Sequence, residues 1–337
     1  MTAQTDQPAT PPAKAERQVN KQRHDFIARN LGVLSISGVF VLLFIFFSLS
    51  TDRFFDVENF VNILRQYAPT VVVAMGMTFV ITTGAIDLSV GSIVGLTAAA
   101  LALLAENGNP IFALIVTLLI GAGIGAINGA LTAYGKLQSF IVTLAALTAV
   151  RGIALLITDG YSTPIDSTVL RPLGHGKFLG LYTPTWIAII TVALAWYVFT
   201  QTRFGRYITA VGSNAESLRR SGVDIRKIQM AALVLTGTLA AVAGILTATR
   251  LGSGSGNSGQ MFELEVITAV VLGGTALMGG RGSVIGSAIG ALTLGIISNG
   301  LVQLKVDVYW VPIVQGTILL VAIFLNSRVF RRWTKGA

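Results

Sequence analysis

Long apolar stretches recur along the chain and predict helices that cross a membrane. From Leu31 onward, runs of roughly 20 mostly hydrophobic residues alternate with short polar connections, and about 20 helical residues span the ~30 Å hydrocarbon core of a bilayer. We therefore predict an all-α integral membrane protein with about ten transmembrane helices. The predicted spans are residues 31–50, 62–83, 87–105, 110–133, 138–157, 184–201, 229–250, 263–280, 283–303 and 308–326.

One predicted span, 263–280, differs from the others. It opens with Glu263 and Glu265 and ends with Gly279-Gly280. Acidic side chains and non-helical backbone are tolerated at membrane depth only where protein or water surrounds them. We expect a broken or re-entrant helix here.

A weak internal repeat is also visible. Residues 91–95 (GSIVG) open the third span and residues 282–286 (GSVIG) open the ninth, each after a glycine-containing break. Interrupted apolar segments in corresponding places of two halves point to a transport pathway. Chance recurrence of Gly-Ser in glycine-rich helices explains the repeat equally well.

Composition supports the membrane assignment and excludes several kinds of chemistry. Hydrophobic residues make up 53% of the 337 residues and charged residues only 12%, and the mean hydropathy is +0.73; a soluble domain of this size needs a larger polar coat. The absence of cysteine excludes disulfides, thiolate metal sites and cysteine nucleophiles. His24 and His175 lie far apart in the sequence, so we expect no metal site.

The basic residues predict the orientation of the spans. If residues 1–29 form a cytoplasmic, disordered tail, the inside segments hold nearly three times as many lysines and arginines as the outside segments, as the positive-inside rule requires. Both termini are then cytoplasmic: the tail 1–29, which lacks signal-peptide features, and the basic tail 328–337, on either side of a membrane domain at 30–327. This placement accounts for the net charge of +9 without a nucleic-acid partner.

The inside loop 202–228 contains the most informative short pattern. Ser213 and Glu216 have the spacing of a capping box, Arg219 and Arg220 suit the last turn of a helix, and Gly222 suits the left-handed stop that follows. We predict a helix of about two turns over 213–222, with Leu218 and Val223 in apolar contact. A helix this short is only marginally stable alone in water. We therefore expect it either to rest on its own protein or to couple to a cytoplasmic motor subunit. The residues predicted for coupling are Ser213, Asn214, Glu216, Leu218, Arg219, Arg220 and Gly222.

Two charged residues at membrane depth are candidates for a transport role. Asp87 follows a break and either N-caps the third span or shapes a pathway. Arg151 lies within an apolar span and needs a partner, for which Asp87 and Asp159 are candidates; a structural ion pair and a solute contact are equally open.

Glycines spaced four residues apart predict close packing between helices. They occur at 121, 125 and 129, and again at 282, 286 and 290, and such small-residue faces let helices approach closely. Asn128 lies beside the first set, where it could donate to a polar solute. The predicted pathway residues are Asp87, Ser89, Asn128, Arg151 and Thr275.

The two larger outer segments, 158–183 and 252–259, either receive a delivery protein or act as linkers. The chain has no phosphate-binding loop, because Gly135-Lys136 is followed by Leu137 and Gly176-Lys177 by Phe178. It also shows no nucleophile elbow or paired catalytic carboxylates. We therefore expect a non-enzymatic subunit that obtains any ATP-derived energy from a separate protein.

Three blocks resemble the ribose-type permeases of ABC importers. Residues 84–92 (GAIDLSVGS) resemble their GIDLSVGS signature, residues 202–222 are similar to their cytoplasmic loop, and residues 262–282 resemble their block built around VVLGGT. The blocks stand in the family's order, and the resemblance runs from about 31 to 326. Glu265 replaces the family's Asp and Thr268 its Ala, which leaves the identity of the solute open.

The resemblance implies a permease homodimer in the bacterial inner membrane. Its implied partners are a cytoplasmic ATPase, which uses ATP and Mg, and a periplasmic sugar-binding protein; this chain itself would hold no cofactor. The solute would be ribose, another pentose, a hexose or a related polyol, moved by alternating access. An ion-coupled secondary transporter and a membrane enzyme or scaffold are the alternatives.

Overall fold

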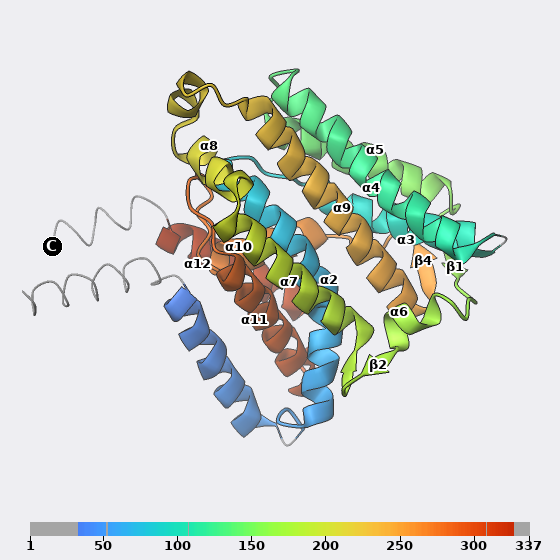
Figure 1. Cartoon of the computed structure of the whole chain (residues 1–337). Helices are drawn as coiled ribbons and strands as arrows, with labels where there is room; N and C mark the ends of the chain where they lie inside the picture. Colours follow the sequence, from blue (N-terminus) through green and yellow to red (C-terminus); the bar gives the residue numbers. More distant parts are fainter. Residues whose placement is uncertain (1–32, 52, 107, 308, 327–337) are drawn as a thin grey trace, which may run out of the picture.

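The computed structural model describes residues 33–51, 53–106, 108–307 and 309–326, and the tails 1–29 and 328–337 lie outside them. Each predicted span contains one helix, and the helices form a single bundle (Figure 1). In chain order the elements are Val33–Ser50, α2 Val57–Thr82, α3 Val90–Glu106, α4 Pro110–Ala133, α5 Ser139–Leu156, β1 Ser162–Pro164, α6 Arg171–His175, β2 Lys177–Phe178, β3 Leu181–Tyr182, α7 Thr183–Gln201, α8 Arg203–Arg220, α9 Ile225–Leu251, β4 Ser253–Ser255, α10 Phe262–Leu272, α11 Val284–Gln303 and α12 Trp310–Asn326.

The helix lengths confirm an all-α membrane protein. Among the described residues, seven helices are long and apolar enough to cross a membrane, and α3 and α12 are shorter apolar helices. The eighth predicted span is broken: its helix, α10, has only 11 residues, about 16 Å, and residues 273–280 of the predicted span are not helical. The total of ten spans and the side of each terminus stay predictions.

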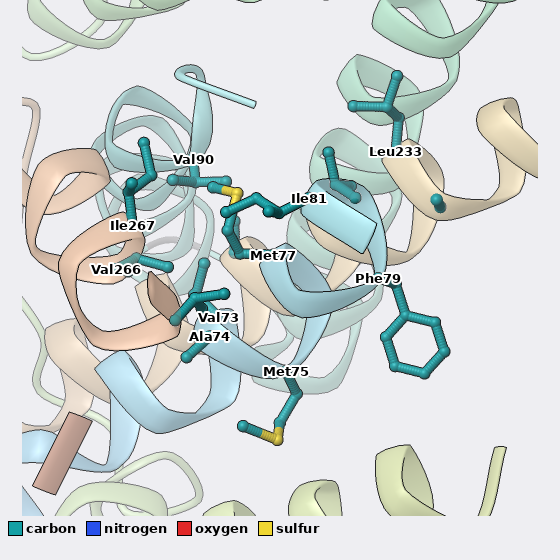
Figure 2. Packing of buried hydrophobic residues seen from close by; sticks show 14 of the residues in the cluster. Val73, Ala74, Met75, Met77, Phe79, Ile81, Val90, Leu233, Val266 and Ile267 are labelled. Atoms are coloured by element: carbon teal, nitrogen blue, oxygen red, sulfur yellow. The ribbon is translucent and has the colours of Figure 1, made fainter. Parts of the chain in front are cut away.

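Helix α2 lies at the centre of the bundle. From Tyr67 to Thr82 every residue is buried, and its apolar side chains pack against α3, α9 and α10 (Figure 2). A helix that is apolar all round is stable only when other helices surround it. The peripheral helices Val33–Ser50, α4, α5 and α7 instead expose many large apolar side chains, as a lipid-facing surface requires.

The predicted glycine faces do bring helices together. A Cβ at Gly121 would clash with the backbone of Gly237 in α9, and one at Gly125 with that of Leu233. On α11, Gly286 and Gly290 likewise meet the backbone of α10 and its C-cap. The predicted packing role is confirmed for these helical glycines, whereas Gly282 precedes α11 and lies against the side chains of Thr82 and Phe199.

The two glycine-containing breaks lie against each other. Gly84, with φ +87°, follows α2, and Gly279 and Gly280, each with φ +79°, follow α10. A Cβ on Gly279 would touch the Gly84 backbone, and the Gly280 amide donates to the Thr82 carbonyl at 2.9 Å. The repeated motifs thus open α3 and α11 from adjoining breaks.

The bundle has two dissimilar ends, which we call the α8 end and the strand end (Figure 1). The α8 end carries α8 and the loop 273–283, joined by the Ser213–Gly280 contact. The strand end carries α6 and the short strands. There β1 pairs antiparallel with β4, with Ser162 opposite Ser255, so the two outer segments that the sequence treats separately form one surface.

Candidate functional site

The predicted coupling helix begins one residue later than expected. Helix α8 starts at Arg203, but Asn214 has non-helical angles (φ −160°, ψ 89°) and divides it into two parts. The Asn214 side chain accepts from the Ser217 amide at 3.0 Å, so Asn214 is the N-cap. The predicted Ser213–Glu216 capping box is wrong: the Ser213 hydroxyl donates to the Thr209 carbonyl at 2.8 Å.

The end of this helix agrees with its prediction. The Gly222 amide donates to the Arg219 carbonyl at 3.0 Å and the Val223 amide to the Leu218 carbonyl at 3.4 Å. This pair of bonds is the Schellman motif, and Gly222 supplies its left-handed residue with φ +80°. Leu218 and Val223 both pack against the hydrophobic core, so Leu218 holds the helix to its own protein; its role in coupling stays a prediction.

The opposite face of the helix is exposed and charged. Glu216 accepts from Arg219 at 3.0 Å and from Arg220 at 3.2 Å, and all three side chains lie open to solvent. The hydrogen bonds from Arg219 and Arg220 hold the pKa of the Glu216 carboxyl below its ordinary value. We call this face the charged face (Glu216, Arg219 and Arg220); it belongs to the second part of α8, which lies at the α8 end of the bundle (Figure 1).

The first part of α8 connects the charged face to the bundle. A Cβ at Gly212 would meet the Thr82 carbonyl and the Gly280 amide, and the Ser213 hydroxyl lies 3.4 Å from the Gly280 carbonyl. The Phe204 ring stacks on Phe79 of α2, with centroids 6.0 Å apart. The first part of α8 therefore contacts the end of α2 and the loop 273–283 that precedes α11.

Three of the predicted pathway residues form one buried chain of hydrogen bonds. Asp87 accepts from the Ser89 amide at 2.9 Å and from the Ser89 hydroxyl at 2.6 Å, and the Asn128 amide donates to the Ser89 hydroxyl at 2.9 Å. Asp87 thus fixes the turn before α3. The N-cap role that the sequence suggested for it is wrong, because its carboxylate does not accept from the first helical amides of α3. Its Oδ2 has no partner among the described residues.

Thr275 belongs to a second buried cluster. Its hydroxyl accepts from the Ser283 amide at 3.1 Å and lies 3.5 Å from that of Ser287, which in turn receives a hydrogen bond from Thr78 of α2 at 2.8 Å. The cluster joins the loop 273–283 to α2 and α11.

Arg151 has partners that differ from both of those predicted. Its guanidinium donates to the carbonyls of Gly256, Ser258 and Gly259 at 2.6, 2.7 and 3.0 Å. Neither Asp87 nor Asp159 forms an ion pair with it in the described part of the chain. Arg151 therefore satisfies the non-helical backbone that precedes α10.

The sequence reasoning missed a polar contact halfway along α2. The Thr70 hydroxyl donates to the Glu265 carboxylate at 3.1 Å, and the Tyr67 hydroxyl is hydrogen-bonded to Ser298. The signal was present, because Tyr67, Thr70, Thr78 and Thr82 recur at helical spacing along one stretch of α2.

A second missed cluster lies at the strand end. Asn59 and Asn299 exchange two side-chain amide hydrogen bonds at 3.1 and 3.0 Å. Gln303 donates to Asn299 at 3.1 Å, and Thr51 donates to Gln303 at 3.3 Å. These bonds hold the start of α2 against the end of α11.

A polar pocket of 520 Å³ opens near the α8 end. It lies between the loop after α2 and the turn that joins α4 to α5, and Thr83, Lys136, Ser139 and Gln229 line it. Ser139 also accepts from the Ile86 amide at 3.2 Å, so the pocket adjoins the residue next to Asp87. No three His, Asp or Glu side chains in the described ranges come close enough to hold a metal ion.

The family model and the relatives that match this chain are all described as permeases. A family model described as "Branched-chain amino acid transport system / permease component" matches residues 59–323. The chain is 41% identical over 294 residues to the ribose import permease protein RbsC of Haemophilus influenzae, covering 85% of this chain and 90% of that protein. It is 38% identical to the RbsC of Bacillus subtilis (94% and 99% covered).

A relative with another sugar in its name is similar over a comparable length. The chain is 34% identical over 367 residues to the xylose transport system permease protein XylH of Escherichia coli, covering 90% of this chain and 93% of that protein. No solved structure matches the chain significantly.

Proposed function

We propose that this chain, which belongs to the permease family described as branched-chain amino acid transport system / permease component, is the membrane subunit of an ABC importer for a monosaccharide. Relatives named for ribose and for xylose import support a pentose, with a hexose or a related polyol as the alternative solutes. The observation that carries the proposal is the capped helix 214–220, whose charged face projects from the bundle while its other face is fixed to it.

The proposed orientation places the α8 end in the cytoplasm of a bacterium. Lys136 lines the pocket near that end, Arg226 begins α9 after α8, and Arg281 lies in the loop 273–283. At the strand end, Arg171 begins α6 and Arg65 donates to Gly174 of α6. This distribution agrees with the positive-inside assignment. Ten membrane segments then leave both termini in the cytoplasm, with α10 and the backbone before it together forming one broken segment. The α8 end thereby faces the compartment that holds ATP.

The proposed partner at the α8 end is a cytoplasmic ATPase. The chain has no phosphate-binding loop, so a second protein must bind and hydrolyse ATP with Mg. Movement of the charged face would pass through Ser213 and Gly212 to Gly280 and Thr82, where the two glycine-containing breaks adjoin. Those breaks are suitable hinges between outward- and inward-open states.

The strand end has the charge expected of a docking surface for a sugar-binding protein. Arg65 and Lys177 both lie over the Tyr182 ring, at 4.2 and 4.6 Å from its centroid. Arg65 also donates to the Gly174 carbonyl at 3.0 Å. Within the described residues these cations form no ion pair, so acidic side chains of a periplasmic partner would complement them.

A neutral, hydroxyl-rich solute suits the polar groups of the bundle. Its hydroxyls need hydrogen-bond partners and no counter-charge, and the interior offers serine, threonine and asparagine side chains with few ions. We further infer that two copies of the chain enclose the solute route, as the resemblance implies.

Reconstitution tests the proposal against the ion-coupled alternative, which the unpartnered Oδ2 of buried Asp87 favours. Vesicles that hold the chain with its ATPase and binding protein should take up labelled ribose or xylose only when hydrolysable ATP faces the ATPase. Vesicles with the chain alone and a proton or sodium gradient should take up none. Gradient-driven uptake by the chain alone, without ATP, would instead establish a secondary transporter.

A further inference from the structure

The chain between β4 and α10 descends into the bundle without helical structure. We call residues 256–261 the unwound segment; β4 ends at Ser255 and α10 begins at Phe262. Gly256 lies against Ala154 near the end of α5, and Gly259 lies against Gly91 and Val94 of α3. The unwound segment therefore runs from the strand end toward the middle of the bundle.

The register of α10 against α2 gives the depth at which the unwound segment ends. Glu265, in the first turn of α10, accepts from Thr70, and Thr70 lies midway along the 26-residue α2. The end of the unwound segment is thus close to the middle of the membrane, where lipid offers no hydrogen-bond partners.

One edge of the unwound segment is satisfied by the protein. Arg151 donates to three of its carbonyls, those of Gly256, Ser258 and Gly259. Glu263 lies beside this edge: a Cβ on Gly91 would meet its carboxylate, which also interacts electrostatically with Arg151. This edge is closed by α3 and α5.

The other edge is open and carries two polar side chains next to the exposed Met261. Asn257 and Gln260 are exposed, and their side chains form no hydrogen bond within the ranges that the structure describes. Irregular backbone at membrane depth is stable only if it is covered by protein or lines a water-filled cavity. Two unpaired amides favour water, because burying them against an apolar surface would cost their hydrogen bonds.

The first turn of α10 adds acidic groups to the unwound segment. Glu265 is partly exposed, whereas Glu263 is only 8% exposed and its Oε2 has no partner among the described residues. Side-chain amides and a carboxylate present both donors and acceptors to hydroxyl groups. Within the described ranges, the cation found at this segment is Arg151, whose guanidinium is occupied by the backbone carbonyls.

We propose that Asn257, Gln260 and Glu265 form a contact site for the hydroxyl groups of the solute, partway across the membrane. The inference rests on the proposed function and adds the side chains that meet the solute. Arg151 is a positioning residue, which holds the unwound segment so that the amides face the route. The site binds a neutral polyhydroxylated solute by hydrogen bonds alone, so it can also release it.

Thiol labelling tests the site directly, because the chain has no cysteine of its own. The variants Asn257→Cys and Gln260→Cys, in the complex with the ATPase and binding protein, are treated with a charged, membrane-impermeant thiosulfonate. Thr148→Cys is the matched control, since Thr148 is exposed on α5 and its hydroxyl bonds only its own helix. The experiment is repeated with saturating ribose or xylose carried by the binding protein.

We expect positions 257 and 260 to react and position 148 to stay unmodified. Solute with ATP should slow the reaction at 257 and 260 at least fivefold. The site would be overturned if neither position reacted, which would mean that lipid or a second copy covers both. It would also be overturned if both positions reacted at a rate that solute does not slow.

A kinetic variant gives a second readout. Gln260→Ala should raise the KM for the sugar about fivefold with a smaller change in kcat, and should raise it less for a deoxy analogue that lacks the contacted hydroxyl. An equal effect on sugar and analogue would contradict the hydrogen bond. If the labelling or the kinetic result fails in a complex that transports sugar with ATP, only this contact site is rejected. If the complex shows no ATP-driven uptake at all, the proposed function is rejected.

Discussion

The Arg151 guanidinium lies 2.6 Å from the Gly256 carbonyl oxygen, although 105 residues separate them along the chain. Arg151 also binds the Ser258 and Gly259 carbonyls. A single long side chain on α5 thus takes the place of the helical hydrogen bonds that the segment before α10 lacks. A charged residue inside a span, which the sequence marks as a functional candidate, here stabilises irregular backbone.

Removing this guanidinium should destabilise the membrane domain. Arg151→Met leaves three carbonyls without donors, and each unsatisfied buried acceptor costs about 1–3 kcal/mol; partial relaxation should leave a net loss of about 2–4 kcal/mol. Thermal unfolding in detergent should show a clear fall in Tm. Arg203→Gln, which changes an exposed arginine on α8, should leave Tm within error, and an equally stable Arg151→Met would contradict the role of Arg151.

Two glycines in α4 should respond differently to the same substitution. Gly121→Ala places a methyl group against the Gly237 backbone and should force α4 and α9 apart, which costs about 1–3 kcal/mol. Gly123→Ala meets nothing within 4 Å and should be neutral or stabilising by up to about 1 kcal/mol. Comparing the two unfolding transitions checks the helix contact, and equal effects would refute it.

The cap of the coupling helix should belong to Asn214. Asn214→Ala removes the acceptor of the Ser217 amide and should cost about 1 kcal/mol of local helix stability. Hydrogen exchange over 214–221 should therefore quicken several-fold. Ser213→Ala should change the exchange rate much less. A larger effect of Ser213→Ala than of Asn214→Ala would instead support the capping box that the spacing predicts.

His175 should make the strand end weakly sensitive to acid. Partial burial and the neighbouring Arg65 and Arg171 lower the pKa of its imidazole below 6.5, although a hydrogen bond to the Thr249 backbone opposes this. The folded state thus favours the neutral ring, so its contribution to stability is present above pH 6.5 and is lost as the pH falls through the lowered pKa. Between pH 7.5 and 5, Tm should fall more in the native chain than in His175→Gln. An identical pH profile would reject the shift.

Much of the fold could be predicted because lipid imposes simple patterns on a sequence. Apolar runs located a helix in every predicted span, and the two acids with the glycine pair before Arg281 predicted the break that α10 shows. The glycine faces on α4 and α11 predicted their close contacts. These features depend on local composition, which the sequence displays.

Contacts between residues far apart in the chain were harder to predict from the sequence. The sequence offered Arg151 only acidic partners, because backbone carbonyls become acceptors only where a helix unwinds. Asn214 was passed over as a cap since Ser213 and Glu216 matched a familiar spacing, whereas the Ser213 hydroxyl donates back to Thr209. The Glu265–Thr70 contact depends on the register of α10 against α2, which no local pattern encodes.

The charged face provides the most direct test of the central claim, that a separate ATPase acts through the helix 214–220. Arg219→Glu with Arg220→Glu reverses its charge, leaves Leu218 in its packing, and removes the pairs with Glu216. Lys227→Glu adds a negative charge nearby, on α9, as a control. In vesicles with the ATPase and binding protein, the rates of ATP-driven sugar uptake and of solute-stimulated ATP hydrolysis should both fall at least tenfold in the double variant. The control variant should keep most of both activities. Uptake by a correctly inserted double variant within twofold of the native rate would contradict the account.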